Sequence, residues 1–320
     1  MKVYFDDYYN IVKIYIAGIN GMVGSAVARL AKKTGHEVLG KSSRELDLTD
    51  RIQTVQEIKN TKPDILVIAA AKVGGIGANS QYPVDFLSLN LQIQTNLIDA
   101  AHINKVKKVI FLGSSCIYPK FAPQPIPETS LLSSALEETN EPYAIAKIAG
   151  LKLIHAYRKQ YGHQWVSLMP TNLYGENDNF DLAQSHVLPA LMNKIHAAKV
   201  AGAKEVTIWG DGMPLREFLH VDDLAEAIIF MATREVDEAL FNVGSGDEIS
   251  ILDLAKAIAE VVGYEGGFTF DKNQPNGTPR KFLDSSRINK MGWASKIELK
   301  TGLINTYDWY LTQLEESSGK

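Results

Sequence analysis

Ser114, Tyr143 and Lys147 are polar side chains that together could protonate a carbonyl oxygen. Tyr143 and Lys147 are four residues apart, so they would share one face of a helix. An ammonium beside a phenol favours the phenolate, and we therefore expect Lys147 to lower the pKa of Tyr143 and make it a proton donor near neutral pH. Ser114 could hydrogen-bond the same oxygen. The alternative is a chance spacing beside serines that only end a strand.

The apolar run 109–112 predicts a buried parallel strand, and Gly113, Ser114 and Ser115 follow at its carboxyl end. Ligands of open α/β sheets bind at this edge. Cys116 comes two residues after Ser114 and would reach the same ligand, although a lone cysteine is often inert core filler. It is the only cysteine, so no internal disulfide can form, which fits a reducing, cytoplasmic compartment.

A glycine-rich turn joins a strand predicted over 12–17 to a helix predicted over 25–34. Gly18, Gly21 and Gly24 would let the backbone approach a pyrophosphate, which then lies on the helix N-terminus. The turn could also be only a tight strand-to-helix connection. Because both the strand before it and the helix after it are present, the motif favours dinucleotide binding.

A basic turn follows the second predicted strand, 37–40, where NAD-binding chains usually carry an acid. Lys41, Ser43 and Arg44 suit a 2′-phosphate and so favour NADP, unless the turn is simply a solvated loop. Asp47 either reaches the adenine amino group or caps a helix predicted over 49–59.

The alternation of strand and helix patterns predicts an α/β fold, namely a Rossmann-type doubly wound parallel sheet with a smaller, mostly C-terminal substrate-binding lobe. Further strands are predicted at 65–70, 165–169, 206–209, 215–219 and 241–243. Further helices are predicted at 87–104, 143–161, 189–199, 224–232, capped by Asp222 or Asp223, and 251–262. We expect a dinucleotide-binding domain over 1–173 and 219–247 and the lobe over 174–218 and 248–320.

Composition narrows the class of partner. A net charge of -4 without any block of Lys or Arg argues against nucleic acid. The longest apolar run, 65–71, is too short to span a bilayer, so we expect no membrane partner. No motif predicts a metal site. A small molecule is therefore the expected ligand.

Several long blocks, in order, resemble the extended short-chain dehydrogenase/reductases from about Lys13 to Tyr310. The blocks are 70–76, 113–119, 140–150, 169–175, 185–187 and 216–223. Within that family, the resemblance implies an NADP(H)-dependent enzyme that inverts C3 and C5 of a GDP-linked 4-keto-6-deoxyhexose and reduces C4. It also implies a homodimer through the exposed faces of 91–101 and 145–157. The alternative is that the apolar faces of these helices simply pack against the sheet.

The resemblance implies that Ser114, Tyr143 and Lys147 carry the reduction, and that Cys116 and His186 are the acid/base pair of the inversions. Both a thiol and an imidazole can titrate near neutral pH. Related dehydratases have an Asp-Glu pair in place of Ser115-Cys116, so we do not expect a dehydratase. The residues do not tell which of the pair is the base at each carbon.

The two lines of reasoning together predict a cofactor site and a substrate site. The cofactor site comprises Gly18, Ile19, Asn20, Gly21, Met22, Val23, Gly24, Lys41, Ser43, Arg44, Asp47, Leu112, Gly113, Ser114, Ser115, Lys147, Pro170, Thr171, Asn172, Leu173 and His186. The substrate site comprises Lys194, Trp209, Arg216, Lys281 and Asp284. Asn20 stands where a basic residue is expected, which shifts recognition of the 2′-phosphate to the basic turn.

Two substrate-site residues have a stated chemistry and a plain alternative. Arg216 could clamp a diphosphate through paired charge-assisted hydrogen bonds, or form a surface ion pair with Glu217 or Asp222. Trp209 could stack on a base or sugar, or belong to the core. Two rival functions also remain: an NAD-retaining nucleotide-sugar 4-epimerase and a non-catalytic dinucleotide sensor.

Overall fold

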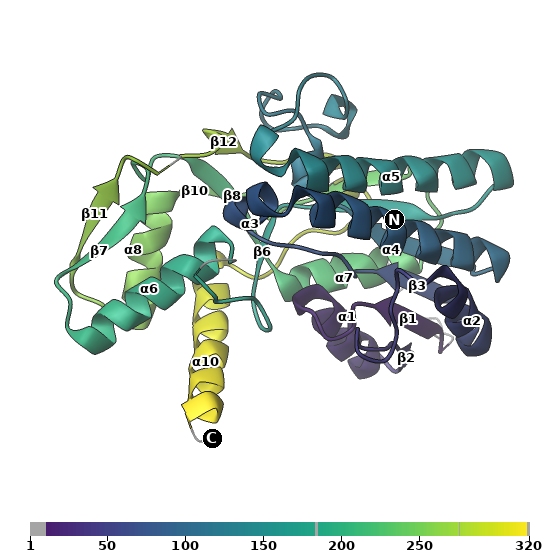
Figure 1. Ribbon diagram of the computed structural model, residues 1–320, viewed down its shortest axis with the longest axis horizontal. Coiled ribbons are helices and arrows are strands. Elements are labelled where there is room, and N and C mark those ends of the chain that lie inside the picture. The colour runs from purple at the N-terminus through teal and green to yellow at the C-terminus, as the bar shows by residue number, and fades with distance from the viewer. Residues whose placement is uncertain (1–10, 183–184, 275, 319–320) are drawn as a thin grey trace.

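The computed structural model describes residues 11–182, 185–274 and 276–318, so most of the extension before Lys13 lies outside the described residues. One six-stranded, all-parallel sheet organises the fold (Figure 1). In spatial order its strands are β2 (Glu37–Leu39), β1 (Lys13–Ala17), β3 (Ile65–Ile68), β4 (Lys108–Leu112), β5 (Val166–Pro170) and β9 (Leu240–Val243). The order reverses at β1, which places the switch point of a doubly wound fold between β1 and β3. The predicted fold class is confirmed.

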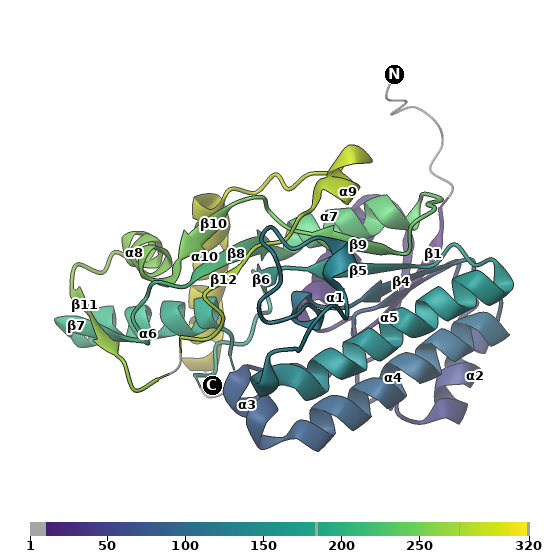
Figure 2. The ribbon, with the colours of Figure 1, turned by 90° about the horizontal axis from the view of Figure 1, so that it is seen from above.

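Helices cover both faces of this sheet (Figure 2). One face carries α1 (Met22–Lys33) and α7 (Val221–Ala232), and the other carries α2 (Arg51–Thr61), α4 (Pro83–Ile103) and α5 (Glu141–Tyr161). Successive strand residues point to opposite faces. In β1, Ile14 and Ile16 therefore pack against α1 and α7, whereas Tyr15 and Ala17 face the layer that contains α4 and α5.

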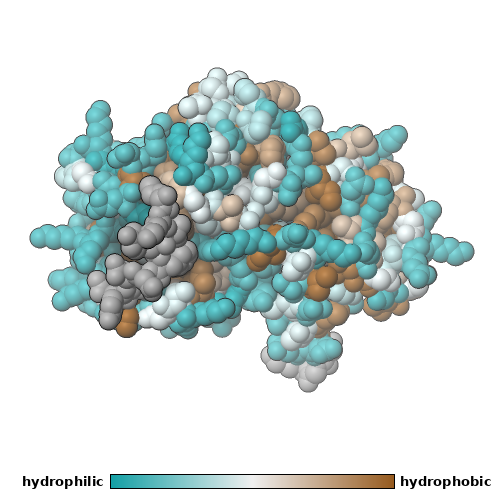
Figure 3. Space-filling view, turned by 180° about the vertical axis from the view of Figure 1, so that it is seen from behind, coloured by the Kyte–Doolittle hydropathy of each residue, from teal (hydrophilic) through white to brown (hydrophobic). Residues whose placement is uncertain are grey.

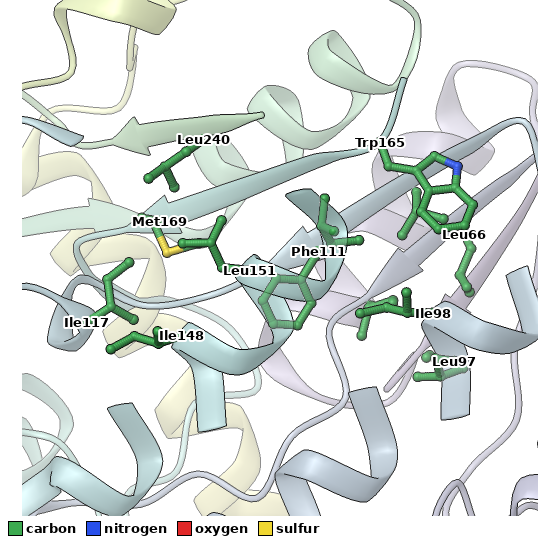
Figure 4. Close-up of a cluster of buried hydrophobic side chains, with 14 of the residues drawn as sticks. Leu66, Leu97, Ile98, Phe111, Ile117, Ile148, Leu151, Trp165, Met169 and Leu240 are labelled. Atoms are coloured by element: carbon green, nitrogen blue, oxygen red, sulfur yellow. The ribbon is translucent and has the colours of Figure 1, made fainter. Parts of the chain in front are cut away.

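The core under α4 and α5 supports the strand end where the polar residues lie. Figure 4 shows Phe111 of β4 and Met169 of β5 among side chains that come from the helices, with Ile148 and Leu151 from α5. All four are buried. This packing fixes the rotation of α5, and with it the face that presents Tyr143 and Lys147.

A smaller lobe lies beyond the carboxyl end of the sheet. Its strands are β6 (Asn172–Tyr174), β7 (Glu205–Trp209), β8 (Leu215–His220), β10 (Glu248–Ser250), β11 (Gly267–Asp271) and β12 (Arg280–Lys281). Its main helices are α6 (Val187–Ala201), α8 (Ile251–Val262) and α10 (Leu299–Ser318). β8 pairs with β6, β10 and β12, and it crosses the predicted domain boundary between 218 and 219. The predicted division itself stays a prediction.

Two helix starts differ from the prediction. The side chain of Asp50, not Asp47, caps α2 by accepting a hydrogen bond from the Gln53 N–H at 3.0 Å. The imidazole of His220, not Asp222 or Asp223, caps α7 by accepting from the Asp222 N–H at 3.2 Å. Sequence rules favour Asp, Asn, Ser and Thr as caps, and a buried histidine can take that place only when the tertiary fold positions it.

The surface seen from behind carries its hydrophobic residues as separate patches among hydrophilic ones (Figure 3). No helix in the described ranges contains an apolar stretch of membrane-spanning length. Two short helices complete the α-helices of the described residues, α3 (Ile76–Gln81) and α9 (Ser286–Lys290).

A seam between residues 124–126 and 280–284 joins the two parts of the molecule. Ile126 forms a bridge with Leu283, and its N–H donates to the Phe282 carbonyl at 2.8 Å. Fully buried Asn242 of β9 holds the seam against the main sheet. Its amide nitrogen donates to the carbonyls of Ile126 at 2.9 Å and Asp284 at 3.1 Å.

Asn242→Ala is expected to lower the free energy of unfolding by at least about 3 kcal/mol. The substitution leaves the two seam carbonyls, and the Tyr118 hydroxyl that donates to the Asn242 amide oxygen at 2.6 Å, without their partners. Each buried polar group left unpaired costs roughly 1–3 kcal/mol. Urea unfolding measures the change. Asn60→Ala, at an exposed position of α2, is the control and should change stability by less than about 0.5 kcal/mol. A loss for Asn242→Ala as small as the control's would contradict this reading of the seam.

Candidate active site

The carboxyl end of β4 brings a hydroxyl and a thiol together. Ser114 caps the one-turn 3-10 helix η1 (Ser115–Ile117), and its hydroxyl oxygen lies 3.4 Å from the Cys116 N–H. Cys116 is buried, with 7% of its surface exposed. Burial raises the pKa of the Cys116 thiol, and the nearby charges of Lys281 and Lys147 and the Ser114 hydroxyl act in the opposite direction. A thiol in these surroundings can take or give a proton when a ligand changes the balance.

Tyr143 and Lys147 lie on the first two turns of α5, on the face toward β4. The Lys147 ammonium donates to the Leu112 carbonyl at 2.8 Å and lies 5.7 Å from the centre of the Tyr143 ring. Burial lowers the pKa of Lys147 to about 8. The expected effect on Tyr143 is wrong for this structure, because burial, together with the nearby Cys116, raises the pKa of Tyr143. Tyr143 is therefore protonated across the neutral range and is an acid in its resting form.

A pocket opens beside Cys116, between the loop 119–140 and the strand β12. Its lining includes Ser115, Cys116, Glu137, Asn140 and Lys281. Lys281 pairs in register with Arg216 of β8. The pocket thus brings the predicted thiol and one predicted substrate residue to the same space.

His186 forms the N-terminal boundary of α6, and its side chain is exposed. It makes no capping hydrogen bond through its side chain. Desolvation of the imidazole by the surrounding residues lowers the pKa of His186, and the positive charge of Lys281 acts in the same direction. The two predicted acid/base residues therefore share an interaction with the same lysine.

The glycine turn has the shape that a dinucleotide requires. Gly18 has a φ of +86°, and a Cβ on it would lie 2.8 Å from the Ala70 backbone nitrogen at the end of β3. A Cβ on Gly24 would lie 2.0 Å from the Gly18 carbonyl oxygen. Gly21 precedes α1 and offers no side chain to its free N–H groups. An N-terminus left uncapped at the switch point fits a pyrophosphate.

The basic turn is only partly available for a phosphate. The Lys41 ammonium pairs with the Glu57 carboxylate at 2.7 Å, a contact that sequence reasoning did not foresee. Ser43 and Arg44 are exposed. Asp47 accepts hydrogen bonds from the N–H and hydroxyl of Thr49, so its carboxylate shapes the turn. Arg44 and Ser43 are thus better placed than Lys41 to meet a 2′-phosphate.

The segment after β5 lies between the sheet and the lobe. The Thr171 hydroxyl and the Asn172 side-chain amide both donate to the Glu217 carbonyl oxygen, at 3.1 Å and 2.8 Å. Glu217 itself is fully buried in β8, and its carboxylate accepts from the Gly246 and Leu283 N–H groups. This contradicts the alternative in which Glu217 pairs with Arg216 at the surface.

The predicted substrate residues fall into two groups. Trp209 at the end of β7 is 57% exposed, and the Lys194 ammonium lies 5.2 Å from its ring centre. A flat, exposed indole beside a cation is a stacking surface and not part of the core. Asp284 differs, because its carboxylate accepts from the Ser286 N–H at 2.9 Å and its carbonyl accepts from Asn242.

Sequence reasoning did not assign Asn140 and Glu137 to the site. Both line the pocket beside Cys116, and the buried amide oxygen of Asn140 has no hydrogen-bond partner in the described part of the chain. An unpaired acceptor in a pocket marks a place for a ligand donor. The block 140–150 begins at Asn140 and is the signal in the sequence that could identify this residue.

Comparison with known proteins agrees with this geometry. The NAD dependent epimerase/dehydratase family matches residues 14–244. GDP-L-fucose synthase 1 of Arabidopsis thaliana is 55% identical over 300 residues, which cover 93% of each chain. GDP-L-fucose synthase of Escherichia coli K12 is 47% identical over 317 residues, covering 96% of this chain and 99% of the relative. The structure of a GDP-mannoheptose C4 reductase from Campylobacter jejuni with NADP bound superposes with a TM-score of 0.87 at 34% identity, covering 95% of this chain and 100% of that one.

Gly24→Ala is expected to weaken NADPH binding at least tenfold, or about 1.4 kcal/mol. The new methyl group would overlap backbone atoms of Gly18 and Ile19, which cannot turn aside as a flexible side chain would. A fluorescence titration with NADPH measures the affinity. Gly77→Ala is the matched control, because a Cβ there meets nothing within 4 Å. Equal affinities for the two variants would contradict the assignment of the turn.

Proposed function

This chain belongs to the NAD dependent epimerase/dehydratase family, and we propose that it converts GDP-4-keto-6-deoxy-D-mannose to GDP-L-fucose. The reaction inverts C3 and C5 of the sugar and reduces its C4 ketone. The observation that carries the proposal is the position of the Cys116 thiol, on the same strand end as Ser114 and facing Tyr143 and Lys147. A reductase alone has no use for a thiol at that place.

The enzyme uses NADP(H), which supplies the hydride for C4. The glycine turn Gly18–Gly24 and the N-terminus of α1 hold the pyrophosphate, and Ser43 and Arg44 receive the 2′-phosphate. Lys147 holds the nicotinamide ribose while its ammonium stays bonded to the Leu112 carbonyl. These residues orient the cofactor toward the end of β4.

Tyr143 protonates the C4 oxygen, and the Ser114 hydroxyl hydrogen-bonds the same atom. Burial keeps Tyr143 protonated until the oxygen becomes an alkoxide, whose much higher proton affinity draws the proton across. The Lys147 charge then stabilises the phenolate that is left. The same donors stabilise the enolate of each inversion, so one site serves both kinds of step.

Cys116 and His186 exchange protons with C3 and C5. The ketone at C4 acidifies both neighbouring carbons, and inversion requires a base on one face of the ring and an acid on the other. Trp209 with Lys194 offers a surface for the guanine base, and Arg216, whose pKa burial lowers, offers a charge for the diphosphate. Asp284 completes the proposed substrate contacts. Pro170 at the end of β5, Thr171 after it and Leu173 of β6 line the cofactor.

We infer that the sheet-forming part, 1–173 and 219–247, holds the cofactor and that 174–218 and 248–320 hold the nucleotide sugar. In support, Lys194, Trp209, Arg216 and Lys281 all come from the second part. We also propose a cytoplasmic location, because a catalytic thiol needs a reducing compartment.

The function can be tested by separating its two half-reactions. The wild-type chain should oxidise NADPH with GDP-4-keto-6-deoxy-D-mannose and leave NADPH unchanged with the corresponding UDP-linked sugar. Tyr143→Phe should lower NADPH oxidation at least 100-fold, since proton donation contributes roughly 10²–10⁴-fold, and should still exchange the C3 and C5 protons in heavy water. Cys116→Ser should lose that exchange at least tenfold more than it loses reduction of a sugar already inverted.

Each rival function predicts a different result. A 4-epimerase that retains its cofactor would show no net NADPH oxidation by the wild-type chain. A dinucleotide sensor would bind NADPH, turn over no sugar, and keep its biological output in Tyr143→Phe. NMR locates the exchanged positions, and full deuterium exchange in Cys116→Ser would rule out the assigned role of the thiol.

We propose a homodimer through α4 and α5, which lie side by side on one face of the sheet (Figure 2). Leu87, Leu89 and Leu91 of α4 are half-buried, and Ile145 on α5 is 41% exposed. A second copy related by a two-fold axis would cover both helices with their own counterparts. The face is therefore suited to an isologous contact.

Ile145→Asp is expected to convert the dimer into a monomer, because it places a charge in an apolar contact. Sedimentation velocity compares the mass with the 35.3 kDa of one chain. Ile304→Asp is a matched control, since Ile304 is also 41% exposed but lies on α10. A monomeric wild-type chain would contradict the dimer. Dissociation by Ile304→Asp and not by Ile145→Asp would place the contact elsewhere.

A further inference from the structure

After the first inversion, the proposed acid/base pair is left in protonation states that do not allow a second one. In a D-mannopyranosyl ring, the hydrogens on C3 and C5 lie on the same face. One residue must therefore remove both protons, and one residue must deliver both from the other face. After the first inversion, the base is protonated and the acid is deprotonated, so the pair cannot repeat the step until one proton passes from the first group to the second.

Lys281 is the cation that lies with this pair. It lines the pocket beside Cys116, and its charge acts on both Cys116 and His186. Strand pairing in register with Arg216 fixes its backbone at the edge of β8. No other lysine in the described part of the chain acts on both members of the pair.

The Lys281 ammonium forms no salt bridge or hydrogen bond among the described residues, in contrast to its neighbour in sequence. The Arg280 guanidinium is held by two hydrogen bonds of 2.7 Å to the Glu248 carboxylate. Side chains alternate along a strand, so Arg280 and Lys281 point to opposite sides. A structural lysine would be expected to end on a carboxylate or a backbone carbonyl, as Lys147 does, whereas Lys281 lines the pocket without either partner among the described residues.

We propose that Lys281 transfers the proton from the group that removes it to the group that delivers it, and so resets Cys116 and His186 between the two inversions. The inference rests on the proposed function. Lys281 gives one proton to the deprotonated acid and takes one from the protonated base, so its own charge and the total number of protons are unchanged. The base and acid return to their starting forms while the sugar stays bound.

Two properties suit lysine for this task. Burial lowers the pKa of Lys281, which brings its neutral amine within reach, and the charge of Arg216 acts in the same direction. Its four-carbon stem lets the nitrogen move between partners. Arginine has the charge but does not lose its proton in proteins. A residue that only anchors the diphosphate could therefore be arginine, and a relay could not.

The test is a single turnover with NADPH in heavy water, followed by mass spectrometry and NMR of the sugar. In the wild-type enzyme, we expect both C3 and C5 to gain deuterium at similar rates. In Lys281→Arg, the rate of the second exchange relative to the first should fall at least tenfold, so that sugar with a single deuterium accumulates. In Lys281→Ala, added ethylammonium should restore the second exchange.

Lys290→Arg, an exposed position on α9, is the control for the substitution, and NADPH binding by every variant checks that it is folded. Equal slowing of both exchanges would overturn the relay. So would a raised KM in Lys281→Ala if Lys281→Arg restored both KM and the two exchange rates, because Lys281 would then be only an anchor. A wild-type enzyme that takes up no deuterium would overturn the proposed function, and the relay with it.

Discussion

The hydrogen bond from the Lys147 ammonium to the Leu112 carbonyl is the contact on which the reducing end of the site depends. Leu112 is the last residue of β4, and Ser114 and Cys116 follow it directly. Lys147 lies one turn after Tyr143 on α5. The bond therefore sets the distance between the two segments that carry the proposed chemistry. The Phe111 ring, 5.0 Å from the same nitrogen, offers its face to the buried charge.

Two buried polar side chains, those of Glu217 and Asn242, fix the relative positions of the segments around the rest of the pocket. The Glu217 carboxylate accepts hydrogen bonds from the Leu283 N–H at 3.1 Å and the Gly246 N–H at 3.0 Å. It also packs against Gly244, where a Cβ would lie 2.2 Å from the carboxylate. Asn242 ties the seam to β9. Because such groups are costly to bury unpaired, the arrangement that satisfies them is strongly specified. The placement of β12, and so of Lys281, follows from these bonds.

Much of the fold could be predicted because local pattern and tertiary structure agree. Short apolar runs predict β1, β3, β4, β5 and β9, and the amphipathic pattern predicts α8 at its observed bounds, 251–262. Local sequence patterns fail to predict elements whose formation depends on tertiary contacts. The three-residue strand β6 exists because β8 lies beside it, and α10 has a weak amphipathic pattern, so neither was predicted.

The residues of the candidate site could be predicted from motifs, but their electrostatic state could not. Spacing on a helix places Lys147 near Tyr143, yet it does not show that the ammonium is directed at a carbonyl or that burial raises the pKa of the phenol. In the same way, the basic turn suggests three ligands of a phosphate, and the pairing of Lys41 with Glu57 depends on a helix that comes later in the chain. Charges and burial are properties of the folded surroundings, which no short stretch of sequence contains.

The seam between 124–126 and 280–284 also restricts how the molecule can move. Enzymes that bind ligands between two lobes often close by rotating one lobe about a hinge, which requires few bonds across the gap. Here Gln124, Ile126, Phe282 and Asp284 form a continuous ladder of hydrogen bonds across that gap, anchored at Asn242. Rotation would break the ladder. The two parts are therefore expected to keep a fixed relation during turnover, and the groups of the candidate site keep their relative positions.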